Sequence, residues 1–231
     1  MEQRIDILQT RRGNPDLKSF RSTIQDFNAI FSTGIFSIDA LVSYAYEKNP
    51  IMESVIYEEG MFIHTYENQK SFQHLAAEVT FNIKPWKDHI SLSVTPGINR
   101  YISTGNNYLH TYTLKELRIN LDASYKNWLL SFMTITPPNR YVYGEQLLKG
   151  DLMHTLMIGY KQPAWSIMAG IHNPFMKTYR SENANWSALN PVKSDIHSTN
   201  MSNTIVVKLN FNLNFGRQYK GANKGCLLYT S

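Results

Sequence analysis

The stretch TIVVKLNFNLNFG, residues Thr204–Gly216, alternates between apolar and polar side chains, and Val206 is the one apolar residue in the polar set. Ile205, Leu209 and Phe215 belong to one set, whereas Lys208 and Asn210 belong to the other. Successive side chains of a strand point to opposite sides of a sheet, so this stretch predicts a strand with one apolar and one wet face. The same pattern returns through most of the chain, with long strands and aromatic residues near their ends. It favours a membrane β-barrel over a soluble β domain.

The composition agrees with this interpretation. The 231 residues are 42% apolar and 13% aromatic but only 18% charged, and the mean hydropathy is −0.34. Such a chain is too hydrophobic for disorder, and it has no run of the roughly 18 apolar residues that a spanning helix requires. A barrel strand needs only about ten residues, half of which face away from lipid. The expected fold is therefore all-β, an antiparallel up-and-down transmembrane β-barrel segment.

The connections between the expected strands differ in length. Those near residues 33, 86, 126 and 162 are tight, while those near 14, 55, 105, 143 and 188 are longer and polar. Bacterial membrane barrels have short periplasmic turns and long extracellular loops, whereas a soluble sandwich has no reason to sort its loops. The pattern predicts about ten strands, over residues 2–12, 20–32, 36–47, 74–84, 90–95, 117–126, 128–134, 151–160, 165–172 and 204–216.

The two faces of these strands differ in charge. No Lys, Arg, Asp or Glu falls on the apolar set, and a slip of one residue would move every charge of the other set into lipid, at roughly 2 to 4 kcal/mol for each basic residue at the midplane. We expect the lumen-facing residues to include Asp39, Glu78, Lys84, Arg118, Asn120, Asp122, Lys208, Asn210 and Asn212. We expect the lipid-facing residues to include Ile38, Val42, Phe81, Leu92, Leu121, Leu209, Phe211 and Leu213.

Aromatic residues occupy two kinds of position. Those beside the short turns predict one interfacial girdle, which is typical of membrane barrels, although a soluble sheet could also cap its core with them. Those in the long loops suit stacking on a carbohydrate or peptide, and they are also ordinary loop residues. The girdle would comprise Phe36, Trp86, Tyr125, Trp128, Trp165 and Phe215, and the candidate ligand contacts are Tyr57, Tyr108, Tyr141, Tyr143 and Trp186.

Catalytic and metal-binding patterns are not found. The seven histidines show no closely spaced ligand pattern, and Cys226 is the sole cysteine. There is no glycine-rich phosphate loop and no nucleophile elbow, so we expect neither an enzyme nor a cofactor. The net charge of +5 is spread along the chain and forms no basic cluster, so we expect no nucleic acid partner.

The ends of the sequence predict a fragment. Met1 is not followed by the apolar core of a signal peptide, although an outer-membrane protein must be exported. Residues 225–231 fit no strand pattern and have the character of translated read-through or a frayed tail. We therefore expect residues 1–224 to be one barrel segment and residues 225–231 to be a non-native or disordered tail.

Two motifs resemble a known family. Gly13, Asn14, Pro15, Asp16, Leu17 and Lys18 resemble a strand-connecting motif of TonB-dependent receptors, and residues 211–224 resemble the last strand and basic tail of the Bacteroidetes outer-membrane β-barrel family. The resemblance covers most of the chain and implies the C-terminal part of a barrel of about twenty-two strands. It also implies an N-terminal plug, which is not visible in this sequence, and contact through it with TonB.

Nutrient uptake through a plug-gated lumen in the cell outer membrane is the function that this resemblance implies. Membrane lipid, the plug, TonB and a surface lipoprotein would then be the partners. Two alternatives stay open at this point. One is a non-transporting outer-membrane barrel with a structural or adhesive role, and the other is a soluble β-sandwich binding protein.

Overall fold

The computed structural model describes residues 2–86, 89–135 and 141–212, and these residues are all-β. Their strands form three sheets, one of nine strands and two of four. No helix capable of crossing a membrane occurs among them.

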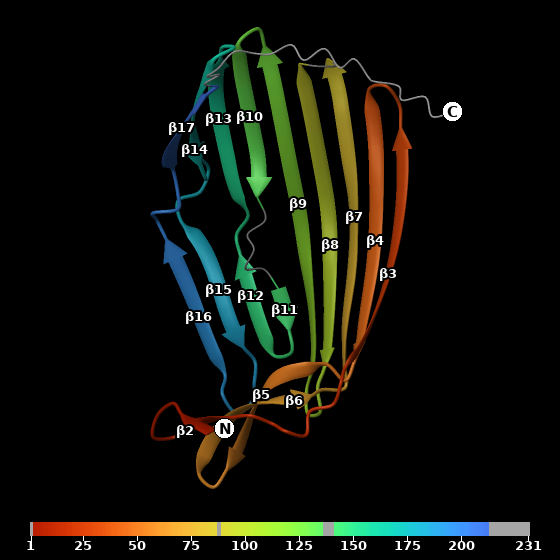
Figure 1. Cartoon of the computed structure of the whole chain (residues 1–231), viewed down its shortest axis with the longest axis vertical. Coiled ribbons are helices and arrows are strands. Elements are labelled where there is room, and N and C mark those ends of the chain that lie inside the picture. The colour runs from red at the N-terminus through yellow and green to blue at the C-terminus, as the bar shows by residue number, and fades with distance from the viewer. Residues whose placement is uncertain (1, 87–88, 136–140, 213–231) are drawn as a thin grey trace, which may run out of the picture.

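The nine-stranded sheet dominates the molecule and is antiparallel throughout (Figure 1). Each strand pairs with the sheet strand that comes next along the chain, which is an up-and-down meander. In spatial order its strands are β3 (Arg21–Ser32), β4 (Phe36–Lys48), β7 (Ser71–Trp86), β8 (Ile90–Thr104), β9 (Leu109–Tyr125), β10 (Trp128–Ile135), β13 (Met153–Lys161), β14 (Trp165–His172) and β17 (Thr204–Phe211).

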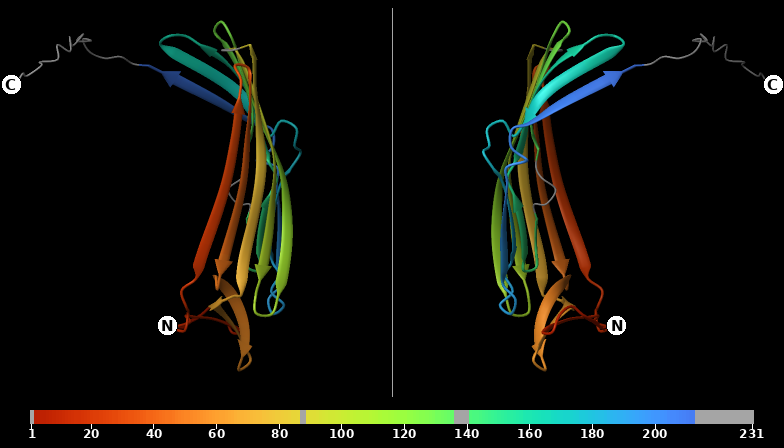
Figure 2. Two further views of the ribbon diagram at one scale, coloured as in Figure 1. Left: turned by 90° about the vertical axis from the view of Figure 1, so that its right-hand side faces the viewer. Right: turned by 90° about the vertical axis from the view of Figure 1, so that its left-hand side faces the viewer.

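The sheet is an open trough. Figure 2 shows that its two sides, at β3 and at β17, come forward of the middle strands, as the right-handed twist of strands favours. Each of these two strands pairs with one neighbour in the sheet, so the expected closed barrel is not observed within the described residues. What the structure establishes is the all-β class and the antiparallel meander.

Short connections gather at one end of the meander, and the long connections follow β4, β10 and β14. The predicted longer loop near residue 105 was wrong, because β8 and β9 are joined by a turn of four residues, closed by a hydrogen bond from the Gly105 N–H to the Tyr108 carbonyl at 2.9 Å. The turns after β3, β7, β9 and β13 lie together at one end, which we call the short-turn end (Figure 1). The chain leaves β4 and β8 at the opposite end, the long-loop end, whereas β10 and β14 stop part of the way toward it and their connections continue there (Figure 1).

The long connections are not irregular loops, because three of them contain hairpins. One small sheet pairs β1 (Glu2–Arg4), β2 (Gln9–Arg12), β6 (Met61–Asn68) and β5 (Ile51–Glu58) in that order, with β2 parallel to β6. The other pairs β11 (Tyr141–Tyr143), β12 (Gln146–Gly150), β15 (Tyr179–Asn185) and β16 (Val192–Ser198). The prediction of about ten strands was therefore too low, since the described residues form the seventeen strands β1 to β17.

The predicted strand over residues 2–12 was wrong. The chain turns back on itself there, because the Asp6 carboxylate accepts a hydrogen bond from the Leu8 N–H at 2.7 Å and the Ile5 N–H reaches the Gln9 carbonyl at 2.9 Å. Such a side-chain bond two residues ahead is typical of an Asx turn. The result is the short hairpin of β1 and β2, outside the nine-stranded sheet.

Strands β8 and β9 are longer than predicted, because β8 runs through Pro96 and Gly97 to Thr104 and β9 begins at Leu109. The alternation is lost beyond the predicted limits, yet the backbone pairing continues, with Pro96 opposite Leu117 and Thr104 opposite Leu109.

The buried core lies at the long-loop end. Met52 and Ile63 are 2% and 1% exposed, and Val142, Leu147 and Ala184 form a cluster against which Trp186 packs. The core therefore belongs to the small sheets and to the adjoining ends of the long strands. The other buried apolar residues are Val55, Phe72, Leu114 and Tyr179.

Candidate functional site

The pairing registers divide the nine-stranded sheet into two faces. Partners across an antiparallel pair point to the same side, and Ile38 pairs with Phe81 while Leu92 pairs with Leu121. The same parity joins Val42 to Ala77, Leu209 to Ile167 and Phe211 to Trp165. Every predicted lipid-facing residue that is described therefore lies on one face, which we call the apolar face. Leu213 lies outside the described residues.

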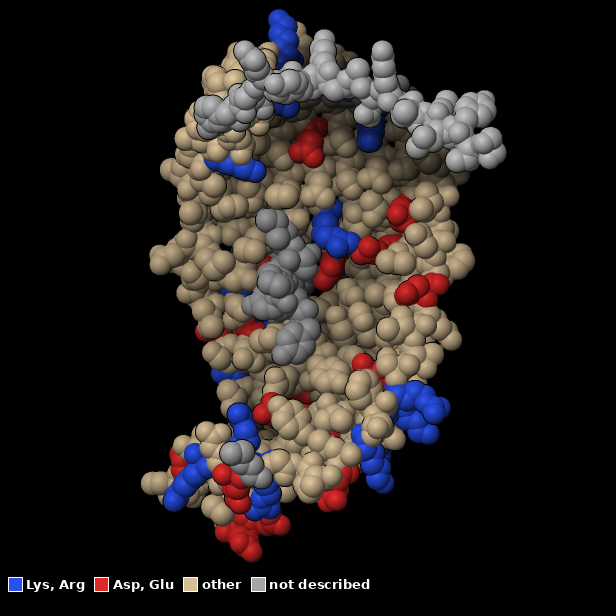
Figure 3. Space-filling model, viewed as in Figure 1, with Lys and Arg blue, Asp and Glu red and all other residues tan. Residues whose placement is uncertain are grey.

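The predicted lumen-facing residues lie on the other face, the polar face. Asp39 pairs with Thr80, Asp122 with Ser91 and Lys208 with Met168. This face is turned to the viewer in Figure 3, on the concave side of the trough, and it carries acidic and basic side chains in the middle of the sheet. By the same alternation it includes Glu78, Lys84, Arg118, Asn120 and Asn210, whereas Asn212 follows the end of β17.

The apolar face has a limited height. On β9 the apolar positions run from Leu117 to Tyr125, which is roughly 26 Å at about 3.3 Å per residue. Beyond Leu117 the same face carries Lys115, opposite Ile98, and Arg100, opposite Thr113. With strands tilted by roughly 40°, this length covers about 20 Å of height, somewhat less than the outward apolar band about 25 Å tall of membrane barrels.

The apolar face is uncovered among the described residues. Leu117, Ile158 and Leu209 are 47%, 55% and 57% exposed. A soluble sandwich would bury these side chains under a second sheet about 10 Å away. The two small sheets lie at the long-loop end instead (Figure 1).

Aromatic rings form a row on this face at the short-turn end. The ring centroids of Trp86 and Tyr125 are 6.3 Å apart, those of Trp128 and Tyr160 are 5.2 Å apart, and those of Tyr160 and Trp165 are 6.0 Å apart. Tyr125 and Trp128 are also cross-strand partners, and Trp165 is the partner of Phe211. Phe36 pairs with Ile83 near the same end, whereas Phe215 lies outside the described residues.

Polar contacts connect the strands on the polar face. Arg118 on β9 forms an ion pair with Glu78 on β7, with about a third of each side chain exposed. The Thr80 and Thr95 hydroxyls are 3.0 Å apart, and the Asn82 amide donates to the Ser37 hydroxyl at 3.2 Å. A wet, hydrogen-bonded face of this kind is typical of a barrel interior.

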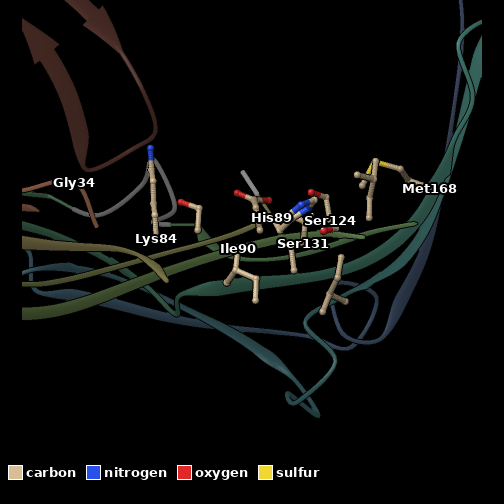
Figure 4. A pocket seen from close by; sticks show the side chains of 12 residues that line it. Gly34, Lys84, His89, Ile90, Ser124, Ser131 and Met168 are labelled. Atoms are coloured by element: carbon tan, nitrogen blue, oxygen red, sulfur yellow. Dashed lines mark hydrogen bonds between the residues drawn. The ribbon is translucent and has the colours of Figure 1, made fainter. Parts of the chain in front are cut away.

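A hollow of about 590 Å³ lies at the short-turn end of the sheet (Figure 4). Lys84, His89, Asp122 and Ser131 are among its lining residues. The His89 ring nitrogen Nδ1 is 3.0 Å from the Ser124 carbonyl oxygen, and the Ser124 N–H donates to the His89 carbonyl at 2.6 Å, so this histidine extends the pairing of β8 with β9 into the short turn. The hollow offers both signs of charge and hydroxyl groups to a solute.

Three of the predicted ligand contacts belong to the packed long-loop end. The Tyr143 hydroxyl donates to Glu47 at 3.0 Å, and its ring meets Phe72 at 4.9 Å. Burial, together with the charge of Glu47, raises the pKa of Tyr143 to about 12. The Tyr108 hydroxyl donates to the Met52 sulfur at 3.4 Å. These rings are engaged within the protein, as is Trp186 in the core cluster.

Tyr57 differs from them because it is 60% exposed, although its ring touches Phe62 at 5.1 Å. Tyr141 begins β11, and its side chain lies outside the described part. Of the predicted ligand contacts with described side chains, Tyr57 is the one that is freely presented.

Sequence reasoning missed two polar pairs that join segments far apart in the sequence. Gln146 donates to Glu53 at 2.6 Å, and the His110 Nε2 atom is 3.9 Å from Glu145 Oε1. Burial raises the pKa of the Glu145 carboxyl. These residues are 35 or more positions apart in the sequence, and no local pattern connects them.

The described residues contain no group of three or more His, Cys, Asp or Glu side chains that could hold a metal ion. Comparisons with family models, with curated proteins and with solved structures give no match. The two faces, the aromatic row and the loop sorting are therefore the observations on which a function must be argued.

Proposed function

We propose that the chain forms part of the wall of an outer-membrane β-barrel, with its apolar face against lipid and its polar face toward a lumen. One observation carries the proposal: an uncovered apolar face that extends roughly 26 Å along β9 and ends in a row of aromatic rings at the short-turn end. Water is a poor solvent for such a face, whereas a hydrocarbon layer with two interfaces suits it.

The finer proposal is nutrient uptake as part of a TonB-dependent receptor. The resemblance of residues 13–18 and 211–224 supports it, as does a concave polar face with ions and hydroxyls suited to a wet passage. Ligand capture at the long-loop end would precede passage along the polar face once a plug is displaced.

A non-transporting barrel with a structural or adhesive role is the second candidate. The packing of Tyr108, Tyr143 and Trp186 into the protein favours it, because these rings are not free for a ligand. Ligand-dependent uptake by cells that carry the protein, and its loss on deletion of TonB, would separate the two candidates.

A pair of neighbouring substitutions tests the membrane assignment. We expect Leu209→Arg to reduce the amount of protein assembled in the outer membrane strongly, because it places a cation on the apolar face at a cost of up to roughly 2 to 4 kcal/mol. Asn210→Arg is the matched control, on the polar face of the same strand. Outer-membrane fractionation measures both, and equal accumulation of the two variants would contradict the assignment.

A further inference from the structure

A second hollow, of about 310 Å³, opens on the apolar face at the short-turn end. Its floor is a row of cross-strand neighbours, Ile90 on β8, Ala123 on β9, Leu130 on β10 and Ile158 on β13. Ala123 lies between Ile90 and Leu130, and its single methyl group leaves the space that a larger side chain would fill. The depression therefore follows from one small residue in a row of large ones.

Aromatic rings wall this hollow toward the turns. Trp86, Tyr125 and Trp128 line it, and each is more than half exposed, at 53%, 56% and 54%. A slot with an aliphatic floor and amphipathic rings at its mouth fits an alkyl chain whose polar end lies at the level of the rings.

A cation stands at the same mouth. The Lys126 Nζ atom lies 5.4 Å from the centroid of the Tyr125 ring, in the two-residue turn between β9 and β10. Lys126 has a φ of 53°, a conformation that glycine or asparagine adopts at lower cost, so backbone geometry does not explain a lysine there. Its apolar stem can lie along the aromatic wall while the ammonium stays in the interface.

We propose that this hollow, which we call the lipid slot, holds one acyl chain of an anionic phospholipid whose phosphate pairs with Lys126. The proposal rests on the membrane assignment above. Short turns are periplasmic in bacterial barrels, so the bound lipid would belong to the inner leaflet of the outer membrane. The slot would then fix the depth of the short-turn end in the membrane.

Tryptophan fluorescence can test the slot directly, because Trp86 and Trp128 line it. The protein is reconstituted into phosphatidylcholine vesicles that contain a small fraction of lipid brominated on its acyl chains, either phosphatidylglycerol or phosphatidylcholine. We expect half-maximal quenching at an about fivefold lower fraction of the anionic lipid, the factor that one lysine near an anionic surface contributes.

Two variants remove the parts of the slot and two serve as matched controls. Ala123→Phe fills the floor and Lys126→Gln removes the cation, and each should abolish the preference for the anionic lipid. Ala77→Phe adds the same ring elsewhere on the apolar face, where Ala77 pairs with Val42. Lys161→Gln removes a cation from the polar face, where Lys161 is the cross-strand partner of Ser166. Both controls should behave as wild type.

Flotation of the vesicles distinguishes failure of the lipid slot from failure of the membrane assignment. A protein that does not float with the vesicles would overturn both the slot and the membrane assignment. A protein that floats, but shows equal quenching by the two lipids or keeps its preference in Ala123→Phe or Lys126→Gln, would overturn the slot alone.

Discussion

The nine-stranded sheet and the long-loop end are built on opposite plans. The long-loop end buries its apolar side chains, with Ile63 at 1% and Leu147 at 3% exposed. The sheet presents its apolar side chains outward, with Leu117 at 47% and Leu209 at 57% exposed. One chain therefore contains a region that buries its apolar side chains and a region that exposes them.

On the proposed membrane assignment, the difference teaches that the solvent, and not the residue types, sets the direction in which apolar side chains point. Apolar groups leave water wherever water is the surrounding medium, which produces the core around Met52 and Ile63. Where hydrocarbon is the medium, the same groups gain nothing from an interior position, and the backbone must satisfy its own hydrogen bonds, as the antiparallel ladder of the sheet does.

The largest effect should come from the buried region. We expect Ile63→Ala to lower the free energy of unfolding by about 2 to 5 kcal/mol, because it leaves a cavity in a packed site. Leu121→Ala, on the apolar face, should cost clearly less, since lipid or detergent can fill the space. Urea titration of the protein in micelles measures both, and an equal loss would break the comparison.

A smaller effect is expected on the polar face of the sheet. Glu78 and Arg118 are about a third exposed in the open trough, so a double-mutant cycle with Glu78→Gln and Arg118→Met should give a coupling free energy of about 0.2 to 1 kcal/mol. The cycle uses unfolding midpoints in micelles. A coupling of several kcal/mol would mean that the pair is shielded from water, and it would place the pair in a dry interior instead of a wet passage.

The last effect is confined to alkaline solution and is a pH dependence at the long-loop end. Folding raises the pKa of Tyr143 from about 10 to about 12, so its stabilising contribution is complete below pH 10 and is lost as the pH rises toward 12. Thermal unfolding between pH 9 and 12 should reveal this loss. Tyr143→Phe should remove that part of the pH dependence, and an unchanged slope in this variant would assign it to other groups.

The sequence predicted the sheet better than the long-loop end for a physical reason. Alternation marks a strand when one face meets a uniform medium, and so the strands at 21–32, 36–48 and 165–172 matched their predictions. In the small sheets, short strands bury few residues and at irregular spacing, such as Met52 and Val55 in β5, which leaves no period of two to detect. The alternation of apolar and polar residues is also lost in the parts of β8 and β9 nearest the long-loop end, so these parts were not predicted.

The candidate site was predictable to a similar degree. The alternation of side chains along each strand assigned residues such as Leu92 and Asp122 to opposite faces. The pairing registers give the same division, because Leu92 pairs with Leu121 and Asp122 with Ser91. The packing of Tyr108 and Trp186 depends on residues far away in the sequence, including Met52 and Val142, so it could not be predicted.

On the proposed membrane assignment, the length of β9 sets how far the long-loop end stands from the membrane surface. About eight residues separate Leu109 from Leu117, and with strands tilted by roughly 40° they span about 20 Å of height. The headgroup layer on each side of a bilayer is only about 5 to 8 Å thick. If the apolar face spans the hydrocarbon, the packed long-loop end is a rigid platform on a β stalk, above the lipid headgroups and within reach of large molecules outside the cell.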